Sequence, residues 1–387
     1  MAPSLTRRVD ELSERGVRPA RPTWAEVDLE AVAGNVRQIK RIVGPEVEIL
    51  AIVKANAYGH GALAVARTAL GNGASACGIA AVNEAVQLRE GGVDAPILVL
   101  GYTPTWLAEE ALLHDVSLTL YDADAARAFS RVAADLRRTA RVHVKVDTGM
   151  GRLGLLPEQV VPFVEEIRAL PGLDLEGIFT HFSVADDEDP AYTHWQLNRF
   201  RGVLDRLAEI GVNFRQVHCA NSAAALRLPE AHFTMVRLGL AMYGLHPSRH
   251  VPLPAGFRPA LAWKTTVAQV KTLPPGSYVS YGNTYRTEQE ETIAVIPVGY
   301  ADGFRRAPTR WKEVLIHGQR APLVGRVCMD QTMIQVSHIP NVRVGDEVVL
   351  IGRQGEDEIS AEEAAGWLGT INYEVVSEIL ARVPRVV

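Results

Sequence analysis

Residues 48–61 read Glu-Ile-Leu-Ala-Ile-Val-Lys-Ala-Asn-Ala-Tyr-Gly-His-Gly and combine the features of a strand, a turn and the start of a helix. The apolar run Ile49–Val53 predicts a buried strand, and Lys54 stands where that strand ends. A turn with Tyr58 follows, and an apolar helical pattern begins at Ala62. Lys54 has two interpretations, because its charge can reach water beyond an apolar stem, or burial can remove its proton and make the amine a nucleophile.

The same alternation of short strand and amphipathic helix repeats as far as residue 238. Strands are expected at 49–53, 76–80, 97–100, 117–120, 142–146, 175–180, 216–219 and 235–238. Strands that alternate with helices form parallel sheets, and this number of units over about 200 residues suits a (β/α)8 barrel. An open doubly wound sheet is the alternative, but no Gly-x-Gly-x-x-Gly follows the first strand. We therefore expect an α/β fold with a TIM-type barrel.

After residue 245 the pattern changes. Residues 246–260 contain several prolines and few periodic positions, which is typical of a linker. Short β-type runs then recur between turn signals, at 265–270, 292–298, 313–316, 333–336 and 347–351. The expected organisation is an N-terminal extension at 1–22, a barrel at 23–245, the linker, and a mostly antiparallel β-domain at 261–387. Within the β-domain we expect a helix at 360–368, with Ser360 as its N-cap.

Composition excludes several classes of function. The 387 residues carry 40 Lys and Arg against 45 Asp and Glu, a net charge of −5, so no nucleic-acid partner is expected. No apolar stretch approaches the ~18 residues of a membrane span, and the N-terminus lacks the apolar region of a secretory signal. The three cysteines are far apart in the sequence, which indicates reduced thiols and no metal site. We expect a cytoplasmic protein.

Polar side chains stand at or near the ends of the predicted barrel strands. They are Lys54, Lys145, His181, Asn221, Ser222 and Arg237. Active sites of such barrels lie at the carboxyl ends of the strands, so these side chains should converge on one face. A structural role would account for one or two of them, whereas the convergence of all of them indicates a binding or catalytic site.

Several segments match a known family pattern. In the barrel region they are Ala-Ile-Val-Lys-Ala-Asn-Ala-Tyr-Gly-His-Gly (51–61), Lys-Val-Asp-Thr-Gly-Met-Gly-Arg-Leu-Gly (145–154), Gly-Ile-Phe-Thr-His-Phe (177–182), Ala-Asn-Ser-Ala (220–223) and Val-Arg-Leu-Gly-Leu-Ala-Met-Tyr-Gly (236–244). In the β region they are Val-Ser-Tyr-Gly (279–282), Val-Gly-Tyr-Ala-Asp-Gly (298–303), Gly-Arg-Val-Cys-Met-Asp (325–330) and Asn-Tyr-Glu (372–374). With these segments the chain resembles the alanine racemases, pyridoxal-phosphate enzymes with a barrel and a C-terminal β-domain. The resemblance covers nearly all of the chain from Thr23 onward, and no motif position departs from the pattern.

The resemblance implies two catalytic bases, Lys54 and Tyr281. Lys54 would hold pyridoxal phosphate as an aldimine in the barrel and, once freed by the substrate amine, act as a base on one face of the α-carbon. Tyr281 would act on the opposite face, from the β-domain of a second subunit, so a homodimer with shared active sites is implied. On its own, a tyrosine in a hairpin would be interpreted as a surface residue.

Arg237 is the residue that bears on the type of reaction. By resemblance it faces the pyridine nitrogen of the cofactor, and an arginine scarcely ever gives up its proton. The ring nitrogen should therefore stay unprotonated, which favours racemisation over decarboxylation or aminotransfer. His218 either orients Arg237 or is a buried core histidine, and the sequence favours neither.

The remaining site residues are also implied by the resemblance. The cofactor phosphate is matched by Tyr58, Ser222, the backbone of Gly239 and Leu240, and Tyr373, with Asn221 beside them and His181 against the ring. Substrate carboxylate contacts are Arg152 and the backbone of Met329, with Asp330 in support. Lys145 is either carbamylated, so that it positions Arg152, or paired with Asp147, as the spacing alone favours. Asp186, Tyr300, Arg306 and Arg326 match a narrow substrate corridor, although singly they would be ordinary surface residues.

The expected function is therefore an isomerase that interconverts L-alanine and D-alanine by a two-base mechanism and supplies D-alanine for peptidoglycan. A racemase of broader specificity and a decarboxylase of the same fold are alternatives. A pyridoxal-phosphate-binding protein without catalysis is a third, but such a protein would not need a β-domain that carries Tyr281.

Overall fold

The computed structural model describes residues 21–387, which divide into two compact units. The first, here called the barrel unit, comprises Leu29–Ala57 and Gly61–Arg258. The second, here called the β-unit, comprises the described residues up to Asp28, Tyr58–His60 and Pro259–Val387. The expected extension at residues 1–22 lies almost entirely outside the described residues.

The barrel unit is built on a parallel sheet of eight strands in the order β8-β7-β6-β5-β4-β3-β2-β9. Their bounds are β2 (Glu48–Ile52), β3 (Ala76–Ile79), β4 (Ile97–Val99), β5 (Val116–Leu120), β6 (Ala140–Lys145), β7 (Leu173–Phe179), β8 (Gln216–His218) and β9 (Met235–Leu238). The edges at β8 and β9 are bridged by backbone bonds from Thr234 N–H to Val217 O (3.2 Å) and from Arg237 N–H to Ala220 O (2.9 Å). The sheet is thus a nearly closed barrel, which confirms the predicted fold class.

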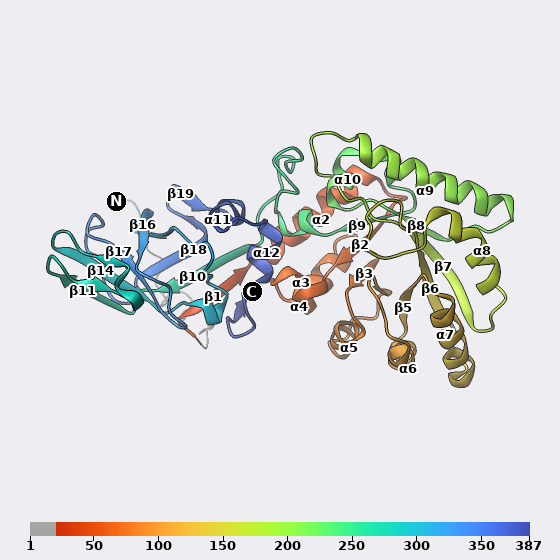
Figure 1. Cartoon of the computed structure of the whole chain (residues 1–387), viewed down its shortest axis with the longest axis horizontal. Helices are drawn as coiled ribbons and strands as arrows, with labels where there is room; N and C mark the ends of the chain where they lie inside the picture. The colour runs from red at the N-terminus through yellow and green to blue at the C-terminus, as the bar shows by residue number, and fades with distance from the viewer. Residues whose placement is uncertain (1–20) are drawn as a thin grey trace. The chain divides into compact units, whose positions relative to one another are not determined.

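Helices surround these strands, and Figure 1 shows α5, α6 and α7 beside one another along the outside of the sheet. The helices are α2 (Leu29–Val43), α3 (Lys54–Tyr58), α4 (Ala62–Leu70), α5 (Val82–Glu90), α6 (Ala108–Leu113), α7 (Ala123–Leu136), α8 (Pro157–Ile167), α9 (Ala191–Glu209) and α10 (Ser222–Arg227), with short 3-10 turns η1 (Thr105–Leu107), η2 (Pro229–Ala231) and η3 (Leu240–Tyr243). Helix α2 precedes β2 in the chain and packs against α4, α10 and η3. No helix among residues 21–387 has the length and apolar character needed to cross a membrane.

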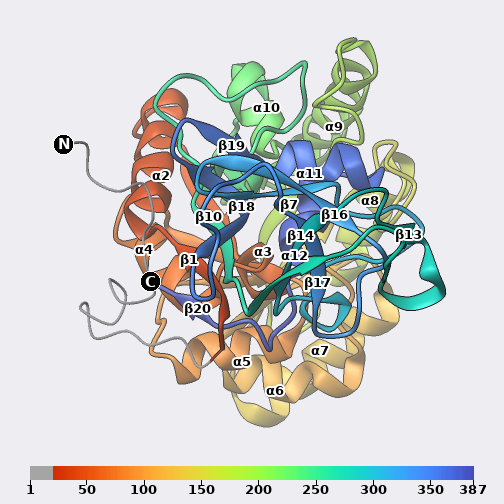
Figure 2. The ribbon, with the colours of Figure 1, turned by 90° about the vertical axis from the view of Figure 1, so that its left-hand side faces the viewer.

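The β-unit contains a largely antiparallel sheet in the order β11-β14-β17-β16-β15-β18-β10-β1-β20 (Figure 2). Its strands are β1 (Thr23–Val27), β10 (Leu261–Thr266), β11 (Gln269–Leu273), β14 (Glu291–Ile296), β15 (Glu313–Ile316), β16 (Gln319–Val324), β17 (Thr332–Gln335), β18 (Glu347–Gln354), β19 (Asp357–Ile359) and β20 (Arg385–Val386). The hairpin β12 (Tyr278–Val279) and β13 (Tyr285–Arg286), the 3-10 turns η4 (Tyr281–Asn283) and η5 (Tyr300–Asp302), and the helices α11 (Ala361–Leu368) and α12 (Asn372–Ser377) complete it. The Ser360 hydroxyl accepts the N–H of Glu363 at 3.1 Å, so the expected N-cap of α11 is present.

The barrel does not begin at Thr23 as expected. Strand β1 (Thr23–Val27) pairs antiparallel with β10 and parallel with β20, so it belongs to the β-unit. The Glu26 carboxylate is fixed there by Lys264 Nζ at 2.9 Å, which explains a charged residue within a largely buried strand. The expected linker also divides differently, because residues as far as Arg258 cluster with the barrel unit.

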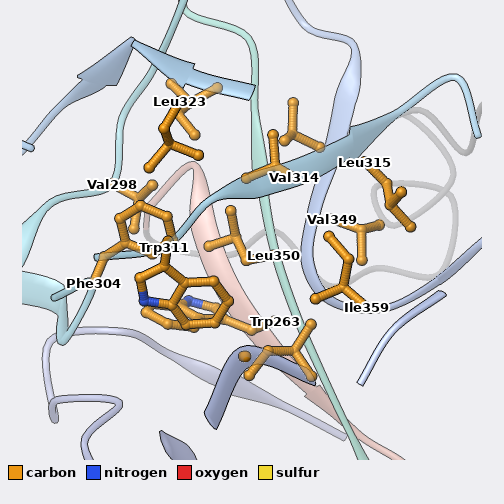
Figure 3. Packing of buried hydrophobic residues seen from close by; sticks show 14 of the residues in the cluster. Trp263, Val298, Phe304, Trp311, Val314, Leu315, Leu323, Val349, Leu350 and Ile359 are labelled. Carbon is orange, nitrogen blue, oxygen red and sulfur yellow. The ribbon is translucent and has the colours of Figure 1, made fainter. Parts of the chain in front are cut away.

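The β-unit has an apolar core of its own, in which aromatic rings are prominent (Figure 3). The rings of Phe304 and Trp311 stack with centroids 4.8 Å apart, and Trp263 meets Trp311 edge-on at 5.8 Å. Such pairs contribute about 0.5–1.5 kcal/mol beyond the burial of their area. Phe304 and its loop are therefore anchored in this core, as is Val327, which lies close to Met329 in the chain. Val279, two residues before Tyr281, belongs to a smaller cluster with Ile293 and Val324.

Candidate active site

Lys54 follows β2 and stands at the carboxyl end of the barrel strands. Burial lowers the pKa of Lys54, the positive charges of Arg152 and Arg237 lower it further, and Glu84 acts in the opposite direction. A lysine with a depressed pKa holds more of the neutral amine that nucleophilic and basic chemistry require. The surroundings of Lys54 therefore favour its interpretation as a neutral, nucleophilic amine over its interpretation as a charged surface lysine.

The chain immediately after Lys54 forms a left-handed turn. Ala55, Asn56, Ala57 and Tyr58 have φ values of +52°, +53°, +54° and +51°. Each such residue costs an L-amino acid roughly 1–2 kcal/mol, so the turn needs support from its surroundings. Glu84 in α5 supplies it, because its carboxylate accepts the N–H of Ala55 at 2.6 Å and the N–H of Ala80 at 2.7 Å. Sequence reasoning predicted a turn at this place but missed its left-handed conformation and the role of Glu84.

Arg237 in β9 is the most extensively bonded side chain of the site. One terminal nitrogen donates to His218 Nδ1 (3.0 Å) and His218 O (3.1 Å). The other donates to Thr180 O, His181 Nδ1 and Cys219 O, each at 2.9 Å. Burial lowers the pKa of Arg237 to about 10, which still leaves the guanidinium charged at neutral pH. Arg237, His181 and His218 are thus brought together, and every one of these partners accepts a hydrogen bond.

Lys145, the last residue of β6, is buried and forms no ion pair with a carboxylate of residues 21–387. Its side chain is 5 % exposed, and its Nζ lies 4.5 Å from the centre of the Phe179 ring. Burial, followed by the charges of Arg237 and Arg152, holds the pKa of Lys145 well below its ordinary value. The alternative of an ion pair with Asp147 is not formed, because the Asp147 carboxylate instead accepts the N–H groups of residues 149, 150 and 151 at 2.9–3.1 Å.

Asn221 and Ser222 connect the start of α10 to the loop after β9. Asn221 is the N-cap of α10, with its side-chain oxygen 3.0 Å from Ala224 N. The Ser222 hydroxyl accepts the N–H of Gly239 at 3.0 Å and of Ala241 at 3.3 Å. Since a hydroxyl that accepts can still donate its own proton, Ser222 remains able to bind an anion.

The two tyrosines expected at the phosphate also meet, within the β-unit. The rings of Tyr58 and Tyr373 are 5.8 Å apart at their centres and inclined by 45°. Burial raises the pKa of Tyr58, which keeps its hydroxyl protonated and able to donate. The next residue, Gly59, has a φ of +84°, which favours glycine. A side chain would also not fit there, because a Cβ atom would lie 2.2 Å from Val376 O.

Tyr281 and Met329 are exposed on the β-unit, with 64 % and 53 % of their surface accessible. Tyr281 lines a hollow of about 760 Å³ together with Ser280, Cys328 and Gln331. Ser280 Oγ donates to Arg326 O at 2.6 Å, which ties the turn of Tyr281 to the segment of Arg326.

The other residues expected at the corridor and in support of the substrate site divide between the units. Tyr300 N–H bonds to Cys328 O at 3.0 Å, and Arg306 Nη1 donates to Val327 O at 2.8 Å. Asp330 pairs with Arg382 at 2.6 Å. These contacts gather Tyr300, Arg306 and Asp330 around one segment of the β-unit. Asp186 lies in the barrel unit, where its carbonyl accepts from Ser248 Oγ.

The barrel residues fit an anionic cofactor. Four cations are close enough to affect the pKa values of one another or of His181: Lys54, Lys145, Arg152 and Arg237. Burial, followed by these positive charges, holds the pKa of His181 well below its ordinary value. Hydroxyl groups and cations are the side chains that hold a phosphate. Within residues 21–387 no group of His, Cys, Asp and Glu side chains could bind a metal ion.

Comparison with known proteins identifies the family. Residues 27–247 match the family model described as alanine racemase, N-terminal domain, and residues 260–387 match the C-terminal domain. An alanine racemase of Symbiobacterium thermophilum is 50 % identical over 365 residues, which are 94 % of this chain and 97 % of that protein.

Solved structures agree with the sequence comparison. The alanine racemase from Bacillus anthracis with bound L-Ala-P has 44 % identity and a TM-score of 0.90, with 95 % of both chains covered. A histidine racemase from Leuconostoc mesenteroides has 31 % identity and a TM-score of 0.87, covering 95 % of this chain and 98 % of that one. Both domain models match in order and the full-length relatives share the fold, so the chain belongs to the alanine racemase family.

Proposed function

We propose that this protein interconverts L-alanine and D-alanine with pyridoxal phosphate as its cofactor. The observation that carries the proposal is Arg237, a buried guanidinium whose terminal nitrogens donate to five acceptors on His181, His218 and neighbouring carbonyls. Family membership supports the same assignment. We infer that D-alanine is supplied for peptidoglycan and that the reaction takes place in the cytoplasm.

The residues that match the family pattern would hold the cofactor. Lys54 would bind it covalently through Nζ, Arg237 would face its ring nitrogen, and His181 would pack against the ring. Its phosphate would be held by Ser222 and the adjoining backbone of Gly239 and Leu240, beside Asn221, and by Tyr58 and Tyr373. When bound, pyridoxal phosphate withdraws electrons from the α-carbon of an attached amino acid and so makes the α-proton acidic.

Arg237 would bias the protein toward racemisation. A guanidinium donates hydrogen bonds without losing its proton, so a ring nitrogen opposite it stays unprotonated. A carboxylate in this position would instead share a proton with the ring and suit decarboxylation. The structure gives Arg237 neutral acceptors and no carboxylate among its side-chain partners within residues 21–387, which supports the racemase over the decarboxylase.

Two groups on opposite sides of the α-carbon would move the proton. Lys54, with its lowered pKa, would take it from or return it to one face, and Tyr281 would serve the other. We propose that Tyr281 comes from a second subunit of a homodimer. Its 64 % exposure and position beside a 760 Å³ hollow are suited to a residue that a partner surface completes.

The substrate carboxylate would be bound by Arg152 and by the backbone N–H of Met329, with Asp330 supporting that segment. We propose that Lys145 is carbamylated, because a neutral buried amine beside cationic Arg152 can react with carbon dioxide and become an anion. Asp186, Tyr300, Arg306 and Arg326 would form the corridor to the site, which would favour a small amino acid.

A racemase of broader specificity is the second candidate. It is favoured by one observation, the shared fold with a histidine racemase at 31 % identity. Steady-state rates with alanine, serine and histidine distinguish the two, and a histidine rate equal to that of alanine would favour the broader enzyme.

Solvent exchange tests the activity itself. The purified protein, loaded with pyridoxal phosphate, is incubated with L-alanine in D2O while the α-proton signal and the D-enantiomer are followed. Loss of the α-proton together with formation of D-alanine is expected. If neither occurs, the chain is a binding protein and the proposal fails.

Mixing two inactive variants tests the shared site. Lys54→Ala and Tyr281→Phe chains are refolded or exchanged together in equal amounts, with each variant alone as control. If Tyr281 acts across the interface, half of the dimers are mixed and each holds one complete site, so about a quarter of wild-type activity returns. No recovery in dimers shown to be mixed would place both bases in one chain.

A further inference from the structure

A line of side-chain hydrogen bonds runs from Arg237 through the interior of the barrel unit. His218 Nε2 lies 2.9 Å from His143 Nδ1, and His143 Nε2 lies 3.2 Å from Glu176 Oε2. His143 is 1 % and His218 0 % exposed. The ring of Phe179 stacks on His218 at a centroid distance of 4.8 Å and an interplanar angle of 7°, which fixes the plane of the imidazole.

The chemistry of arginine fixes the direction of every bond in this line. Arg237 can only donate, so His218 Nδ1 must accept from it at 3.0 Å. The single N–H of neutral His218 is then on Nε2 and donates to His143 Nδ1. His143 in turn carries its N–H on Nε2 and donates to Glu176. A second proton on either imidazole would turn its accepting nitrogen into a donor. Two N–H groups would then face each other, and the hydrogen bond between them would be lost.

The line ends on a carboxylate that is held as an anion. Ser117 Oγ donates to Glu176 Oε2 at 2.7 Å, and Arg141 Nε lies 3.8 Å from Glu176 Oε1. Burial raises the pKa of Glu176, but the hydrogen bonds from His143 and Ser117 outweigh it and lower the pKa to about 2. Glu176 therefore acts as an acceptor at every pH at which the protein would work.

Two features of the neighbouring backbone serve this arrangement. The register of β6 and β7 shifts between Val142 and His143, as in a β-bulge, which redirects a side chain. Gly177, opposite His143 in the ladder, leaves the space for its ring, because a Cβ there would lie 2.4 Å from His143 Nδ1. The register shift and Gly177 together make room for the buried His143 ring in this orientation, which indicates that the backbone is adapted to it.

We propose that His143 and Glu176 are positioning residues that fix the tautomer of His218 and, through it, the orientation of Arg237 toward the bound cofactor. The inference rests on the proposed function only in its last step, the cofactor. The assignment of the tautomers depends on the protein alone. Without Glu176, His143 could place its proton on either nitrogen, and His218 would lose the partner that keeps Nδ1 free for Arg237.

Nitrogen NMR of histidine-labelled full-length protein tests the first step without any reaction. Signals of His143 and His218 are assigned from His143→Gln and His218→Gln spectra. The expected result in the wild type is protonated Nε2 and unprotonated Nδ1 on both rings, before and after loading with pyridoxal phosphate. A protonated Nδ1 on His218 would overturn the inference.

Variants test the second step. Glu176→Leu and His143→Leu should lower kcat for alanine by about tenfold or more while KM changes less than about threefold, because the substrate contacts are elsewhere. They should also shift the His218 signals. His143→Gln, whose amide can both accept and donate, should recover most of the loss.

His232→Leu is the matched control, because His232 is also buried in the barrel unit but bonds to Ala225 O outside the line. It should lower stability with no shift of the His218 signals and no selective fall in kcat. Equal effects of His143→Leu and His232→Leu on kcat would show a purely structural role and refute the inference. An inactive wild type with the expected tautomers would instead refute the proposed function and leave the tautomer assignment standing.

Discussion

Replacing Lys145 by methionine should stabilise the protein, and the gain should shrink as the pH rises. Lys145 is 5 % exposed and forms no ion pair within residues 21–387, and burial followed by Arg237 and Arg152 depresses its pKa. Methionine fills a similar volume without an amine to desolvate. The wild type therefore carries a cost at neutral pH that Lys145→Met removes.

The sign and size follow from proton linkage. Between the depressed pKa of the folded protein and the ordinary value of 10.5, the unfolded chain binds the Lys145 proton and the folded chain does not. Unfolding then takes up a proton, so wild-type stability rises with pH by up to about 1.4 kcal/mol per unit from this group. The advantage of Lys145→Met should fall by up to that amount between pH 8 and pH 9, since the other groups titrate alike in both proteins.

Urea denaturation of the cofactor-free protein in buffers purged of carbon dioxide measures this difference. Lys264→Met is the matched control, because Lys264 is equally buried at 5 % exposure but bonds to Glu26 at 2.9 Å and Glu347 at 3.3 Å. Removing the Lys264 amine leaves the carboxylates of Glu26 and Glu347 without this cation and should lower the free energy of unfolding by about 3–5 kcal/mol. A constant difference between wild type and Lys145→Met from pH 8 to pH 9 would refute the argument that Lys145 is neutral when folded.

Bicarbonate extends the same experiment to carbamylation. If the neutral amine adds carbon dioxide and releases a proton, bicarbonate should raise the unfolding temperature of the wild type and leave Lys145→Met unchanged. An equal rise in both proteins would be a general salt effect and would count against the carbamate.

Three further changes test the residues around Lys54 and the second base. Lys54→Ala should abolish the visible absorbance of covalently held cofactor and the activity in both directions, and retention of both would exclude Lys54 as the anchor. Tyr281→Phe should keep that absorbance but lower kcat by about 10²–10⁴-fold, and a fall of less than tenfold would exclude it as a base. Ala55→Gly should stabilise by about 0.5–1 kcal/mol by relieving a φ of +52°, whereas Ala64→Gly in helix α4 should destabilise by about as much, as calorimetry would show.

Sequence patterns predicted the barrel well because most of its strands are rich in apolar residues and are buried along most of their length. Strands such as Val116–Leu120 are buried at every position, and this burial leaves a direct mark on composition. Strand β1 (Thr23–Val27) could not be assigned to the β-unit from the sequence, because its partner β10 lies more than 230 residues further along the chain. Pairings of that separation depend on the whole fold, and local periodicity does not record them.

The sequence predicted which residues belong to the candidate site, but it did not predict how they are arranged or which other residues hold them in place. The motifs drew attention to Lys54, Arg237 and Ser222 because charged and hydroxyl groups stood at strand ends. Glu84 could not be recognised, since it lies 29 residues from the turn that it holds and forms two bonds to backbone N–H groups. A signal was present in Asn56, a residue type that tolerates the left-handed conformation, but single residues of this kind occur in many turns.

The acidic residues near the site explain why its cations remain available. Glu84 bonds to the residue after Lys54, Asp147 lies two residues after Lys145, and Glu176 is linked to Arg237 through two histidines. Each of these carboxylates is nevertheless occupied by N–H or O–H donors of its own. None of them forms an ion pair with Lys54, Lys145 or Arg237 within residues 21–387. A carboxylate that already accepts several hydrogen bonds gains little from approaching a further cation and would lose those bonds. The positive charge is therefore left uncompensated by the chain, and an anionic cofactor and substrate would supply the balance.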